Sequence, residues 1–172
     1  MHSEELRLNL ATRQNMANCL GRLGRHEEAI KLGREVLAGK RQLHGDKNYR
    51  TISSEMNLAT ALYQAGQCDE SVRIMRRLLP FSRRELGPDN VHTIRIETNL
   101  GLFLSQRNTI PSRDDLLESI AILDPLSKRM NRILGAQHPE TINANATLSV
   151  ASRKLAALAA LPPRQRATLV DA

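Results

Sequence analysis

Apolar positions recur along this chain at the spacing of α-helices, in two kinds of segment. The first kind has a short apolar cluster that is followed by a glycine. The two clearest copies are Met16, Ala17 and Leu20 before Gly24, and Leu58, Ala59 and Leu62 before Gly66. Because glycine takes positive φ without strain, it is favoured just after the end of a helix. This pattern predicts helices that stop at these glycines.

The second kind of segment opens with acidic residues and continues with a longer apolar stripe. The acidic pairs are Glu27-Glu28 and Asp69-Glu70. The stripes are Ile30, Val36 and Leu37 in one copy, and Val72, Met75, Leu78 and Leu79 in the next. Acidic side chains are stabilising at helix N-termini, so these pairs indicate where each second helix begins.

The two kinds of segment alternate with a fixed period. The step from Thr51 to Thr93 is 42 residues, and the step from Thr93 to Thr141 is 48. Gly45, Gly87 and Gly135 repeat the same two steps. The repeated cluster reads Asn15-Met16-Ala17, Asn57-Leu58-Ala59, Asn99-Leu100-Gly101 and Thr147-Leu148-Ser149. A period that holds at several positions is typical of stacked helical units.

Residues just before three of the first-kind segments are suited to capping a helix. Asn48, Asn90 and His138 hold equivalent places there, and Asn is a favoured N-cap residue. Pro139 follows His138 at the first helical position, where its missing N–H costs nothing.

These patterns predict an all-α protein, a right-handed superhelical solenoid of antiparallel helix pairs with about seven helices. We expect a repeat array over residues 3–161, with repeats at 3–45, 46–87, 88–135 and a partial one at 136–161. The six additional residues of the third period fall in a polar, Pro-containing loop over 107–113. The last helix, from His138 to Leu161, is expected to cover the end of the stack, and residues 162–172 to form a loose tail.

Composition and charge narrow the range of functions. Aromatic residues make up 2% of the chain, so stacking platforms for single-stranded nucleic acid are scarce and a nucleic-acid partner is disfavoured. The net charge of +7 favours an acidic partner, although basic residues that alternate with Glu and Asp also simply solvate helical faces. Two cysteines, no long apolar run and no signal peptide favour a cytoplasmic location without a membrane span.

The sequence shows no motif that indicates catalysis or cofactor binding. The stretch from Gly33 to Lys40 approaches a phosphate-binding loop, but its spacing is wrong and it lies in a predicted helix. The five histidines show no metal-binding pair, and acidic pairs are explained by helix N-termini. We therefore expect no enzymatic activity, no metal and no cofactor.

The combined motif resembles the 42-residue tetratricopeptide repeats of kinesin light chains over most of the chain. It consists of Asn-Leu-Ala, Leu and Gly, then an acidic pair, then Leu-Gly-Pro-Asp and Thr-Ile, as at Asn57-Leu58-Ala59 and Leu86-Gly87-Pro88-Asp89. The resemblance implies that the first helices of each pair line a concave groove that holds a partner peptide. It also implies that Ala17, Ala59, Gly101 and Ser149 lie where paired helices approach most closely.

Within that groove the resemblance gives a role to a ladder of carboxamides at Asn15, Asn57 and Asn99. A carboxamide both donates and accepts hydrogen bonds, so it can bind the backbone of an extended peptide. The repeat register places further polar residues on the same face: Asn18, Tyr63, Gln64, Arg95 and Gln106. The alternative is that these Asn side chains bond between neighbouring helices.

Two functions remain open from the sequence. One is a protein-interaction module or adaptor that holds a partner protein or peptide, with acidic segments favoured. The other is a structural repeat subunit, or part of a longer array, that packs within a larger assembly without binding a peptide.

Overall fold

The computed structural model describes residues 2–107 and 111–161, in which it has seven helices and no strand. The helices are α1 (His2–Arg22), α2 (His26–His44), α3 (Tyr49–Gln64), α4 (Cys68–Glu85), α5 (Val91–Gln106), α6 (Arg113–Leu134) and α7 (Pro139–Ala160). This confirms the predicted all-α fold class. Part of the predicted loop, residues 108–110, and the predicted tail, residues 162–172, lie outside the described residues.

The helix ends follow the local signals of the sequence. Asn48 caps α3 by accepting a hydrogen bond at Oδ1 from the Arg50 N–H at 2.9 Å. His138 caps α7 in the same way, with Nδ1 accepting from the Glu140 N–H at 3.3 Å, and Pro139 is the first residue of that helix. Gly24 and Gly66 have φ values of 77° and 80°, which confirms that the chain turns there through a conformation suited to glycine.

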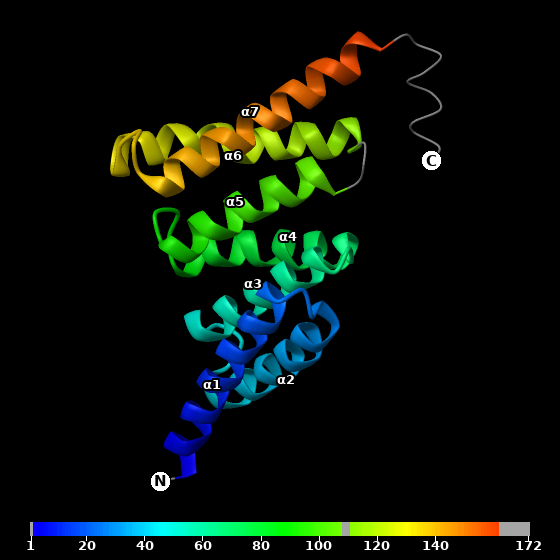
Figure 1. Cartoon of the computed structure of the whole chain (residues 1–172). Helices are drawn as coiled ribbons and strands as arrows, with labels where there is room; N and C mark the ends of the chain where they lie inside the picture. The colour runs from blue at the N-terminus through cyan, green and yellow to red at the C-terminus, as the bar shows by residue number, and fades with distance from the viewer. Residues whose placement is uncertain (1, 108–110, 162–172) are drawn as a thin grey trace. The chain divides into compact units, whose positions relative to one another are not determined.

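The chain forms two compact units, Met1–Ile96 and Glu97–Ala172, and the boundary falls inside α5. In the first unit α1 packs on α2, α2 on α3 and α3 on α4, and α1 also contacts α3 (Figure 1). The apolar stripes predicted for α2 and α4 are buried, and Val36 and Met75 are fully inaccessible to solvent. Met16 is exposed although its repeat equivalent Leu58 is buried.

In the second unit α7 packs on α6, as Figure 1 shows for the orange and yellow helices. Ala144 and Ala151 of α7 are fully buried, as are Leu123, Leu126 and Met130 of α6. The last helix is thus packed against the helix that precedes it in the chain.

Small residues at one repeated position allow the paired helices to approach closely. Ala59 is fully buried, and its carbonyl accepts a hydrogen bond of 2.7 Å from Ser71 Oγ of α4. Gly101 repeats this arrangement in the second unit, where its carbonyl accepts from Ser119 Oγ of α6, also at 2.7 Å. Ala17 is buried too, but Ser149, the fourth residue predicted for this position, is exposed on α7, which is the last helix described.

Candidate functional site

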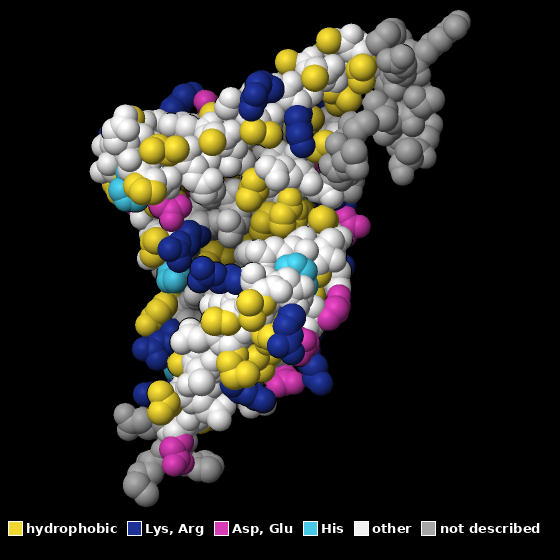
Figure 2. Space-filling model, viewed as in Figure 1, with side chains coloured by type: hydrophobic (Ala, Val, Ile, Leu, Met, Phe, Trp, Pro, Cys, Tyr) yellow, Lys and Arg dark blue, Asp and Glu magenta, His cyan; other side chains and the backbone are white. Residues whose placement is uncertain are grey.

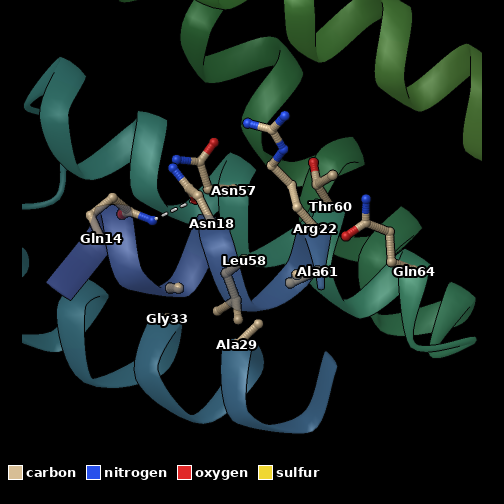
Figure 3. A pocket seen from close by; sticks show the side chains of 12 residues that line it. Gln14, Asn18, Arg22, Ala29, Gly33, Asn57, Leu58, Thr60, Ala61 and Gln64 are labelled. Atoms are coloured by element: carbon tan, nitrogen blue, oxygen red, sulfur yellow. Dashed lines mark hydrogen bonds between the residues drawn. The ribbon is translucent and has the colours of Figure 1, made fainter. Parts of the chain in front are cut away.

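A pocket of about 210 Å³ opens in the first unit between α1, α2 and α3. Its base is made of small or apolar residues, among them Ala17, Ala29, Gly33 and Leu58, all of which are buried. Its polar residues come from the first helix of each pair: Gln14, Asn18 and Arg22 from α1, and Asn57, Thr60 and Gln64 from α3. Figure 3 shows Leu58 directed to Ala29, whereas Asn18, Asn57 and Arg22 point to the opposite side.

A directed chain of hydrogen bonds crosses three helices and ends at this pocket. Lys40 Nζ donates to Ser54 Oγ at 2.6 Å, and Ser54 Oγ donates to Gln14 Oε1 at 2.7 Å. Gln14 Nε2 then donates to Asn18 Oδ1 at 3.3 Å, the bond drawn in Figure 3. An ammonium group can only donate, so Lys40 fixes the direction of every later bond in the chain.

The hydrogen-bond chain therefore determines which end of the Asn18 carboxamide is left for a ligand. Its oxygen is occupied by Gln14, and its Nδ2 donates no hydrogen bond within the described part of the chain. The Asn57 carboxamide makes no hydrogen bond there at all, although its side chain is half-buried. Asn18 thus offers the N–H donors of its Nδ2 to the pocket. Asn57, in the neighbouring repeat, offers both a donor and an acceptor.

Gln64 and Arg22 complete the polar side of the pocket. Gln64 Oε1 lies 3.3 Å from the position that a Cβ atom would take on Gly21, so a side chain there would crowd the carboxamide. Arg22 is exposed in the last turn of α1 and adds a positive charge to the pocket.

Of the eight residues predicted for the site, the structure brings Asn18, Asn57 and Gln64 together in this pocket. Asn15 is exposed on α1 and does not line it. Tyr63 is half-buried on α3, where burial raises the pKa of its hydroxyl, and Arg95 is exposed on α5. Asn99 and Gln106 belong to the second unit, where Asn99 is half-buried and Gln106 exposed.

The repeat pattern of the sequence did not indicate Gln14, Arg22, Ser54 or Lys40. Gln14 is buried in the structure, and a buried carboxamide needs hydrogen-bond partners. The sequence does not show this burial. The partners of Gln14 are Ser54 of α3 and Asn18 of α1, and Lys40 of α2 bonds in turn to Ser54. Helical periodicity does not show which residues of three different helices meet.

A second, more highly charged groove of about 470 Å³ lies between α2, α3 and α4. The buried Glu55 carboxylate pairs there with Arg77 and, at 3.1 Å, with Arg41. Arg34 pairs with Glu70 at 3.0 Å. Glu97, 42 residues after Glu55, is also fully buried and pairs with Arg129 of α6. These pairs link helices of the same repeat or of adjacent repeats, so we assign them to packing within the helical stack.

Stacked pairs of antiparallel helices define a helical repeat protein. Residues 7–84 match the family model of the tetratricopeptide repeat. The fold is similar to two crystal structures of a Podosopora anserina protein assigned as a kinesin light chain, with nearly identical TPR-like repeats. One of the two has a TM-score of 0.71 at 17% identity over 94% of this chain and 71% of that chain. The other has a TM-score of 0.69 at the same identity, over 94% and 72%.

A more distant structural likeness is to BtubC (BKLC) from P. vanneervenii. The TM-score is 0.56 at 16% identity, over 92% of this chain and 67% of that one. No curated protein sequence matches the chain at a significant level. The chain therefore has the fold of kinesin-light-chain-like repeats, and its residues 7–84 match the tetratricopeptide repeat model.

Repeats of this family mediate protein–protein interaction or scaffolding, and the family is non-catalytic. In the described ranges no helix is both long and apolar enough to cross a membrane. The same ranges contain no group of three or more His, Cys, Asp or Glu side chains placed to hold a metal ion.

Proposed function

We propose that this chain is a non-enzymatic interaction module that holds an extended segment of a partner protein against α1 and α3. The peptide would lie over the pocket of Asn18, Asn57 and Gln64, with its backbone bonded by the carboxamides. The observation that carries the proposal is the directed hydrogen-bond chain that leaves the Asn18 N–H groups for the pocket.

A peptide backbone suits this arrangement of donors and acceptors. Its carbonyl groups accept from Asn18, and the Asn57 carboxamide can accept from one peptide N–H and donate to a carbonyl. Such contacts do not depend on the side chains of the peptide, so they supply affinity rather than sequence selectivity. The apolar base around Leu58 and Ala29 leaves room for one small side chain of the partner.

Charge favours acidic residues in the partner segment. The chain carries a net charge of +7, and Arg22 belongs to the pocket itself. Figure 2 shows Lys and Arg side chains spread over the visible face, with acidic side chains among them. Long-range attraction of this kind raises association rates and is screened beyond about 8 Å at physiological salt. Binding should therefore weaken, but persist, as salt rises.

The proposal places the module in the cytoplasm, where thiols stay reduced. Cys19 is exposed and Cys68 half-buried, and both are free thiols. Free, accessible thiols suit a reducing compartment.

The test is to select binders from an unbiased display library of unstructured peptides and to map the bound peptide by NMR on the full chain. We expect the largest amide and side-chain shifts at Asn18, Asn57 and Gln64, and little change at Asn143, an exposed Asn of α7. Failure to select any peptide, or shifts confined to other surfaces, would favour the structural subunit instead.

A further inference from the structure

A second pocket of the first unit, of about 220 Å³, has no place in the proposed peptide site. Four basic residues line it: Arg7 of α1, Lys40 and His44 of α2, and Arg50 of α3. Leu10 and Leu43 supply apolar walls. The turn between α2 and α3 is only four residues long, so it brings the end of α2 next to the start of α3.

No acidic residue lines this pocket among the residues that the structure describes. The acidic residue of the adjacent turn, Asp46, is paired with Arg41 outside the pocket at 3.0 Å. Arg50 is held by its neighbour Tyr49: its Nε donates to the Tyr49 hydroxyl at 3.0 Å, and its guanidinium lies 5.6 Å from the ring centre. That contact orients the guanidinium group without neutralising it.

The three cations Arg7, Lys40 and Arg50 repel one another and disfavour protonation of His44. Burial lowers the pKa of His44, and the charges of Arg50, Arg7 and Lys40 lower it further. Burial also lowers the pKa of Lys40, and Arg50 adds to that effect. An anion bound between these groups attracts each of them and so offsets their mutual repulsion, which favours the protonated form of His44.

We propose that this basic pocket binds a phosphate group through Arg7, Lys40, His44 and Arg50. Two guanidinium groups present planar sets of N–H donors, which suit the several oxygens of a dianion. The volume also exceeds the ~30 Å³ share of one water molecule, so the group can enter with part of its hydration. Lys40 has three N–H bonds, so it can keep its bond to Ser54 while it contacts the phosphate. The inference goes beyond the proposed peptide site and does not require it.

The test is to titrate the full chain with inorganic phosphate, holding ionic strength constant with sodium chloride, and to follow the His44 ring protons by NMR. We expect a saturable shift and a higher pKa of His44 in the saturated protein. Arg7→Gln and Arg50→Gln should each weaken binding about tenfold, since each removes a charge-assisted hydrogen bond. The matched control is Arg132→Gln, which removes an exposed arginine of α6 and should change affinity by less than about twofold.

A second arm identifies the source of the phosphate group. A Gly/Ser peptide with one phosphoserine is compared with inorganic phosphate and with the unphosphorylated peptide. Tighter binding of the phosphopeptide assigns the pocket to a phosphorylated side chain, and equal affinity assigns it to free phosphate. A linear, non-saturating response to both probes would overturn the proposal, as would equal weakening by Arg132→Gln. The phosphate titration uses no selected peptide, so its result does not depend on whether the proposed peptide site binds.

Discussion

A carboxamide has two different ends, and its use in recognition depends on which end the protein already occupies. Asn18 keeps its donor because Gln14 uses its oxygen, and Gln14 is oriented through Ser54 by Lys40. Lys40 also lines the basic pocket. One lysine therefore contributes to both candidate sites, in one through its charge and in the other through the direction of its hydrogen bond.

Some of these residue roles could be predicted from the sequence and others could not. The Asn48 cap and the positive φ of Gly66 depend on the nearest residues along the chain, so a repeated local motif was enough. The repeat register predicted that Asn18, Asn57 and Gln64 share one face, and their role in binding a peptide remains a prediction. The bond between Ser54 and Gln14 joins residues 40 positions apart, and no local pattern shows such a contact.

Two glycines inside helices provide a residue-scale prediction. A Cβ on Gly33 would lie 3.4 Å from Leu58 Cδ1, which is ordinary contact, whereas a Cβ on Gly101 would lie 2.5 Å from Leu123 Cγ. Gly33→Ala should stabilise the protein by up to about 1 kcal/mol, because alanine favours the helix more than glycine does. Gly101→Ala should destabilise it by about 1–2 kcal/mol, because the fully buried Leu123 must move.

Urea unfolding of both variants at one pH measures the two changes. Destabilisation by Gly33→Ala, or a Gly101→Ala protein as stable as the wild type, would show that the helix spacing is wrong.

Among the helices, the repeated contact that recurs with least change is a serine of the second helix bonded to a carbonyl of the first. Ser71 and Ser119 both make this bond, and they are 48 residues apart, as are Thr93 and Thr141. Ala29 stands at the equivalent place in α2, where the hydrogen bond is missing but the small volume is kept. Volume rather than hydrogen bonding is thus the common requirement where paired helices cross.

The docking of α7 gives an element-scale prediction. Ala151 is fully buried on α7, which packs on α6, so Ala151→Leu should overpack that contact and cost about 1–3 kcal/mol. Ala156→Leu changes an exposed alanine of the same helix and should alter stability by less than about 0.5 kcal/mol. Thermal melts by circular dichroism compare them. Equal melting of the two variants would mean that α7 is not docked through Ala151.

At the scale of the whole molecule, the period of the sequence was sufficient to predict the class of fold. Capping residues and small residues recur at equivalent positions after a 42-residue step. Helices of the described residues repeat with the same step. The boundaries of the repeats, and the role of the last helix in covering the end of the array, remain predictions. The ligand could not be predicted from the sequence to the same extent. A repeat specifies how helices stack, whereas recognition depends on side chains that differ between the copies.

The central claim is that the carboxamides of α1 and α3 serve binding and not folding. The most direct measurement compares a selected peptide's affinity, by fluorescence anisotropy, with the melting temperature for the double variant Asn18→Ala/Asn57→Ala. Asn143→Ala, at an exposed position of α7, is the matched control. The account predicts a loss of affinity of about tenfold or more, with a melting temperature within about 2 °C of the wild type. Unchanged affinity, or stability lost in step with affinity, would contradict it and show that these side chains belong to the packing of the repeats.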